Sequence, residues 1–162
     1  AALEMAAILA DVYPDVFSAA GIHSGLARGA ARDVMSAMSA MRNGGVPSVA
    51  FTGTLHPGFA ARRIIFQGDK DSTVHPSNAT ALVAAAIGEG ATPQRITQRS
   101  VRGRGYARHE FAGADGQTQL ELWTLEGTGH AWSGGKAAGS YTDANGPDAS
   151  AQMIRFFVGA GA

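Results

Sequence analysis

The chain contains no cysteine among its 162 residues, so neither a disulfide framework nor thiol chemistry is available to it. Charged residues are scarce, at 16% of the sequence, and 13 basic residues balance 13 acidic ones. A neutral chain has no overall field that would attract nucleic acid or an anionic membrane. No apolar run reaches the roughly 18 residues that a membrane-spanning helix needs. We therefore expect neither nucleic acid nor a membrane as a partner.

A further absence concerns serine. None of the serines has glycine on both sides at the spacing G-x-S-x-G. That spacing is typical of the strand-to-helix turn that carries the nucleophile of an α/β-hydrolase. The chain instead opens on a pattern typical of the helix that follows such a turn.

Against these absences, a hydrophobic content of 45% is that of a globular protein, and the length suits one domain spanning residues 1–162. Helical spacing of apolar residues, together with caps and breakers, predicts helices over 3–12, 76–87 and 149–158. Apolar or alternating runs predict strands at 17–23, 62–67, 106–111 and 118–125, the last two forming a hairpin that turns at Asp115 and Gly116. This order predicts an α/β fold with a mostly parallel sheet. The segment 26–57 is interpreted as a cap or a crossover insertion.

A histidine and two acids follow predicted strands. Residues 127–135 read GTGHAWSGG and contain His130, and residues 68–74 read GDKDSTV and contain Asp69 and Asp71. Because carboxyl ends of parallel strands meet at one edge of a sheet, these loops are expected to lie together. A general base in acyl transfer is most often histidine, and a carboxylate fixes its tautomer. The sequence therefore predicts His130 as base and one of the two acids as its partner; alternatively, the acids cap their own turns and His130 is an ordinary loop residue.

Other residues are candidates for the walls of a pocket. His23 and Ser24 end the first predicted strand, and Trp132 lies next to His130, so all three are interpreted as substrate-binding residues, although Trp132 equally fits a packing role. A metal site built from Asp69, Asp71 and neighbouring histidines matches no compact ligand motif, so no metal is expected. Arginines over 95–108 resemble an RNA-binding tract, but a solvated hairpin edge fits a neutral chain better.

Several motifs give the chain a resemblance to a known family. From Ala6 onward it resembles the polyhydroxybutyrate-depolymerase-like esterases, an α/β-hydrolase family that includes feruloyl esterases. The matching motifs are YPDVF at 13–17, HSGL at 23–26, GDKDSTVHP at 68–76, GHAWSGG at 129–135, GSYTD at 139–143 and GPDAS at 146–150. The resemblance covers most of the chain.

The resemblance implies a carboxylic-ester hydrolase with a Ser-Asp-His triad. It assigns the acid to Asp71 and the base to His130, and it places the nucleophile elbow directly before Ala1, so the serine is not in this chain. It implies no cofactor, a polyester, hydroxyalkanoate or hydroxycinnamate ester as substrate, a secreted or periplasmic location, and a partner in the N-terminal half of the same fold. The rival interpretation is a catalytically inactive fragment or binding module of that fold.

Overall fold

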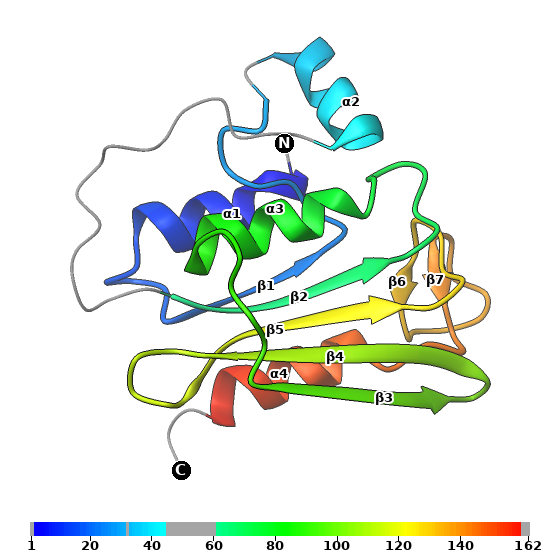
Figure 1. Ribbon diagram of the computed structural model, residues 1–162. Helices are drawn as coiled ribbons and strands as arrows, with labels where there is room; N and C mark the ends of the chain where they lie inside the picture. The colour runs from blue at the N-terminus through cyan, green and yellow to red at the C-terminus, as the bar shows by residue number, and fades with distance from the viewer. Residues whose placement is uncertain (1, 32, 45–60, 160–162) are drawn as a thin grey trace.

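The computed structural model describes residues 2–31, 33–44 and 61–159, and its centre is a five-stranded sheet (Figure 1). The helices are α1 (Ala2–Val12), α2 (Val34–Asn43), α3 (Ser77–Ile87) and α4 (Ala149–Val158). The strands are β1 (Ala19–His23), β2 (Arg62–Gly68), β3 (Arg95–Val101), β4 (Arg104–Ala112), β5 (Thr118–Leu125), β6 (Trp132–Ser133) and β7 (Thr142–Asp143).

The sheet has the order β1-β2-β5-β4-β3, with β6 and β7 forming a separate small pair. β1, β2 and β5 are parallel, and β4 runs antiparallel to both β5 and β3. The sheet is therefore mixed, with a parallel half and an antiparallel half. The carboxyl ends of β1, β2 and β5 lie at the same edge, which is where an open α/β sheet binds its ligands.

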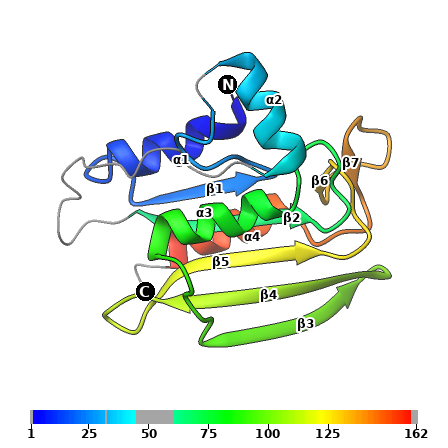
Figure 2. The same cartoon turned by 45° about the horizontal axis from the view of Figure 1, so that its top comes forward.

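Buried side chains alternate between two cores because neighbouring residues of a strand point to opposite faces. Ile65 packs under α1 and α3, whereas Ile64 and Phe66 pack against α4. Figures 1 and 2 show α1 and α3 across one face of the sheet and α4 across the other. The continuous apolar run of β2 thus fits a strand that is covered on both faces.

The helices and strands expected from the sequence are present, with small changes at their ends. β1 begins at Ala19 rather than at residue 17, because the preceding residues close a turn in which the Phe17 amide donates to the Tyr13 carbonyl at 2.9 Å. The arginine-rich segment forms the hairpin of β3 and β4, with the mostly exposed β3 at the edge of the sheet. At the start of α4, the predicted cap Asp148 accepts a hydrogen bond from the Ala151 amide at 3.0 Å.

Only part of the segment 26–57, the interpreted cap or insertion, lies in the described chain. Its helix α2 begins with a capping box, in which Asp33 and Ser36 bond each other's backbone amides. The buried Asn78 side chain of α3 donates to the Ala40 carbonyl at 3.0 Å and so fastens α2 to α3. Residues 45–57 lie outside the described residues.

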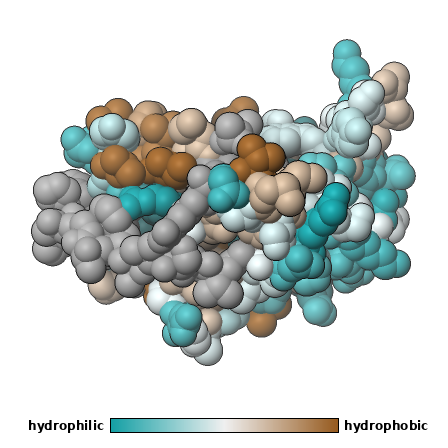
Figure 3. Space-filling model, turned by 90° about the horizontal axis from the view of Figure 1, so that it is seen from above, coloured by the Kyte–Doolittle hydropathy of each residue, from teal (hydrophilic) through white to brown (hydrophobic). Residues whose placement is uncertain are grey.

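Apolar side chains are exposed on α1, on the turn after it and on α2. The list comprises Met5, Val12, Tyr13, Val16, Phe17, Val34, Met35 and Met38. Figure 3, which looks onto the side that carries α2, shows apolar surface among the polar atoms. Within the described residues, no helix is both long and apolar enough to span a bilayer.

Candidate active site

The loops that follow β2 and β5 are bound to each other at the carboxyl edge of the sheet. The Lys70 amide donates to the Thr128 carbonyl at 3.1 Å, and the Gly127 amide donates to the Asp69 carboxylate at 2.7 Å. At Gly68 the two loops approach so closely that an added Cβ would lie 2.2 Å from the Thr128 carbonyl oxygen. Asp69 is thus a loop-bridging acid, and a glycine at 68 permits the approach.

Asp71 is the acid that contacts His130. Its side chain is fully buried, and its Oδ2 lies 2.9 Å from Nδ1 of His130. Its Oδ1 accepts the amides of Thr73 and Val74 at 2.9 and 2.8 Å. Gln67 contacts Oδ2 from the other side. These bonds fix the carboxylate at one position and supply it with donors, as a buried charge requires.

The contact defines the tautomer of His130. A carboxylate only accepts hydrogen bonds, so Nδ1 carries the hydrogen and Nε2 keeps its lone pair. The imidazole is 29% exposed and lines a pocket, so the ring is open to a reacting group. An imidazole held by a carboxylate at Nδ1, with Nε2 accessible, is the arrangement of a general base.

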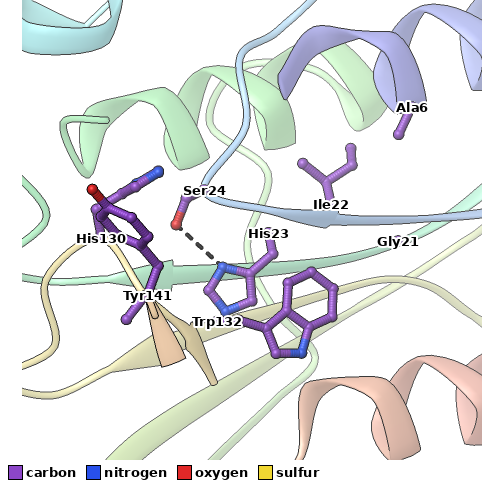
Figure 4. Close-up of a pocket in the computed structure, with 9 residues that line it drawn as sticks. Ala6, Gly21, Ile22, His23, Ser24, His130, Trp132 and Tyr141 are labelled. Atoms are coloured by element: carbon purple, nitrogen blue, oxygen red, sulfur yellow. Dashed lines mark hydrogen bonds between the residues drawn. The ribbon is translucent and has the colours of Figure 1, made fainter. Parts of the chain in front are cut away.

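A pocket of about 370 Å³ opens beside His130 (Figure 4). Its other walls come from α1, the end of β1 and the small β6–β7 pair. The three residues interpreted from sequence as substrate-binding, His23, Ser24 and Trp132, all line it. Four of the five predicted site residues therefore line one pocket, with Tyr141 as an additional lining residue, and the fifth, Asp71, contacts His130.

His23 is packed and bonded within the protein. Its ring stacks on Trp132 and on Phe66, with centroids 4.9 and 5.7 Å apart. Its Nε2 accepts the Ser133 amide at 3.0 Å, and its Nδ1 lies 3.2 Å from Ser24 Oγ. Burial, with a smaller contribution from the nearby His130 and against the opposing effect of Asp71, lowers the pKa of His23 from 6.5 to about 4. His23 is therefore neutral at physiological pH.

The neutral state of His23 makes stability depend on pH. Between pH 6.5 and 4 the unfolded chain binds a proton at His23 that the folded chain does not bind, because the folded pKa is the lower one. This stabilisation is complete above pH 6.5 and is lost as the pH falls, by up to about 1.4 kcal/mol per pH unit. We expect urea unfolding at a series of pH values to show that the free energy of unfolding depends less steeply on pH in His23→Gln than in the parent. An equal slope in both proteins would contradict the assignment.

The hairpin β3–β4 supports the loop that carries β7. Arg102 donates to the carbonyls of Ala144 and Gly146, and Arg104 forms an ion pair with Asp143 at 2.7 Å. Burial would raise the pKa of Asp143, but hydrogen bonds from Arg104 and its neighbours outweigh burial and hold that pKa below its ordinary value. From the sequence, these arginines were interpreted only as part of a solvated hairpin edge. Their bonds to the loop that carries β7 were not predicted.

Loss of this support has a measurable cost. We expect Arg104→Ala to lower the free energy of unfolding by about 1.5 kcal/mol, since a hydrogen-bonded ion pair at a largely buried carboxylate is removed. Arg99→Ala, on the exposed strand β3, is the matched control and is expected to stay within about 0.5 kcal/mol of the parent. Chemical denaturation at pH 7 measures both; equal losses would show that Arg104 contributes no more than a surface arginine.

Tyr141 was also missed as a lining residue. It lies inside the GSYTD motif, but nothing in that motif signals a pocket. Its carbonyl accepts the Trp132 amide at 2.7 Å, which places its exposed ring beside the pocket.

The described side chains offer no candidate metal site. Those of residues 5–31, 33–44 and 61–159 contain no group of three or more ligating residues that could hold an ion.

Comparisons with known proteins agree on an esterase scaffold. The model of the family described as Esterase PHB depolymerase matches residues 1–109, a range that includes Asp71 and ends before His130. Acetyl xylan esterase from Aspergillus awamori has a similar fold, with a TM-score of 0.58 and 20% sequence identity over 79% of this chain. The chain spans 50% of that enzyme's length. No functionally curated protein matches it significantly.

Proposed function

Because the chain belongs to the PHB depolymerase family of esterases, we propose that it supplies the acid and the base of a carboxylic-ester hydrolase. The observation that carries the proposal is the 2.9 Å contact between the buried Asp71 carboxylate and His130 Nδ1. Asp71 orients the imidazole and stabilises its protonated form, and His130 is the general base. Asp69 has no part in the chemistry, because its carboxylate bonds the Gly127 amide.

The reaction uses a serine that these 162 residues do not hold at a G-x-S-x-G turn. His130 Nε2 takes the hydroxyl proton as the serine oxygen attacks the ester carbonyl. The tetrahedral intermediate collapses to an acyl-enzyme, and His130 returns the proton to the leaving alcohol. Water then attacks the acyl-enzyme with His130 again as base, which releases the acid and restores the serine. No cofactor takes part in this scheme.

Trp132 is proposed as a wall of the substrate pocket. It is 39% exposed although its ring stacks on His23, and it lines the pocket. An aromatic face offers apolar contact to the acyl or alcohol part of an ester. Polyesters, hydroxyalkanoate oligomers and hydroxycinnamate esters all fit this description.

The serine is proposed to come from an N-terminal half of the same fold. β1 lies at an edge of the sheet, where its second row of backbone groups has no strand partner among the described residues. Exposed apolar residues lie beside it on α1 and in the following turn, including Val16 at 65% and Phe17 at 39%. Further strands and helices docked here would cover both features.

The test is an assay of the chain alone and of the chain co-expressed with an N-terminal half that carries the G-x-S-x-G turn. We expect a chromogenic short-chain ester to be hydrolysed, and a serine-directed phosphonate to label protein, only in the combination. His130→Ala should abolish turnover by the combination. Labelling of the isolated chain would mean that one of its own serines is the nucleophile. A folded combination without turnover would favour the rival function, an inactive binding module.

A further inference from the structure

The hydrogen bonds around His23 have a fixed direction. The Ser133 backbone N–H can only donate, so His23 Nε2 accepts it and carries no hydrogen. The hydrogen of the neutral ring therefore lies on Nδ1, and Nδ1 donates to Ser24 Oγ at 3.2 Å. Stacking on Trp132 and Phe66 prevents the ring from turning over to exchange its two nitrogens.

Ser24 is consequently left with a hydrogen to donate. Its oxygen already accepts from His23, and within the described part of the chain no acceptor is found for its hydroxyl hydrogen. The residue is 2% exposed, yet it lines the pocket beside His130 (Figure 4). A buried hydroxyl that lacks an acceptor is unfavourable unless a ligand supplies one.

The backbone at Ser24 supports a functional role. Its φ of 51° is in the left-handed region, which is unfavourable for a residue other than glycine. The other described non-glycine residues with positive φ are Tyr141, which also lines the pocket, and Arg102, which sits in the β3–β4 turn. Strain of this kind is retained where the surroundings enforce it, and it clusters at ligand sites.

We propose that the Ser24 hydroxyl is a ligand-binding donor for an ester that carries an acceptor oxygen in its acyl chain beyond the ester group, with His23 as its positioning residue. Pairing an otherwise unpaired buried donor discriminates between ligands with and without the acceptor. The remaining pocket walls at this end include Ala6, Ile22 and Trp132, whose apolar atoms provide contact but no competing acceptor. The proposal rests on the ester hydrolase proposed above.

The first measurement is the tautomer of His23 in the ¹⁵N-labelled chain. Long-range ¹H–¹⁵N correlation spectra at pH 7 should show a protonated Nδ1 and an acceptor Nε2 for His23. A hydrogen on Nε2 would mean that Nδ1 accepts from the Ser24 hydroxyl instead of donating to it, and would overturn the proposal.

The second measurement compares two esters of nearly equal shape, methyl methoxyacetate and methyl butyrate, which differ by an ether oxygen in place of a methylene. NMR titration of the Trp132 indole signal gives the affinity of each. We expect the parent chain to prefer the methoxyacetate by about fivefold, the effect of one hydrogen bond. In Ser24→Ala and Ser24→Gly the preference should fall to about one.

The two variants separate binding from folding. Both remove the hydroxyl, but glycine tolerates the positive φ, so Ser24→Gly keeps the fold if Ser24→Ala is too strained to do so. Ser100→Ala on β3 is the control and should keep the parent's preference. A parent chain that shows no preference, binds neither ester, or keeps its preference in both Ser24 variants would overturn the proposal.

These results are independent of hydrolysis. If turnover by the combined halves fails while the Ser24-dependent preference is present, the proposed function falls and the binding donor stands. If turnover depends on His130 but the preference is absent, only the inference about Ser24 and His23 falls.

Discussion

Replacing Asp71 with asparagine is expected to lower kcat for ester hydrolysis about 10⁴-fold in the chain combined with the proposed N-terminal half, which corresponds to about 5.5 kcal/mol of transition-state stabilisation. The carbonyl oxygen of the introduced side chain can still accept the amides of Thr73 and Val74, so the loop keeps its shape. Its NH₂ group would instead donate to His130 Nδ1 and place the imidazole hydrogen on Nε2, where the base needs a lone pair. Steady-state kinetics with a chromogenic ester measures the effect.

Asp69→Asn is the matched control, two residues away in the same loop. An asparagine oxygen can accept the Gly127 amide as the carboxylate does, so kcat is expected to stay within about tenfold of the parent. Equal losses in the two variants would mean that the shape of the loop, rather than the Asp71 carboxylate, determines the rate.

Much of this arrangement could be predicted from the sequence, because it depends on local patterns. The apolar run of β2 and the alternation of β5 indicated strands whose ends bear Asp71 and His130, and parallel strands bring such ends to one edge. The choice of Asp71 over Asp69 was different. Composition and spacing allowed either acid, and only the family resemblance favoured Asp71. If Asp71 is the acid of the triad it must contact His130, and the structure contains that contact.

What the sequence could not supply are contacts between segments far apart in the chain. The sequence predicted His23 as a substrate-binding residue but gave no sign that its Nε2 bonds the amide of Ser133, which lies 110 residues away. Arg104 looked like a solvated surface residue, yet it pairs with Asp143 across 39 positions. No periodicity or motif encodes such pairings, because they depend on how the end of β1 packs against β6 and how β4 packs against β7.

Gly68 is the strongest case of such a non-local requirement, and Gly68→Ala is expected to lower the free energy of unfolding by about 3 kcal/mol. An alanine Cβ would lie 2.2 Å from the Thr128 carbonyl oxygen and 2.8 Å from that of Gly129, and both are backbone atoms that no side-chain rotation can move away. Gly159→Ala is the control, since its φ is −72° and an added Cβ meets nothing within 4 Å. Urea denaturation of the two variants measures the difference.

The same substitution should also separate His130 from Asp71. Relieving the overlap requires the loop after β5 to move away from β2, and that loop carries His130 while the loop after β2 carries Asp71. The Lys70–Thr128 bond lies directly beside the overlap, so it is expected to break first. The Nδ1 proton of His130, shifted downfield by its carboxylate partner, should therefore disappear from the ¹H spectrum of Gly68→Ala and persist in Gly159→Ala. A Gly68→Ala protein that retains both its stability and this signal would show that the close approach of the two loops is not what holds the pair together.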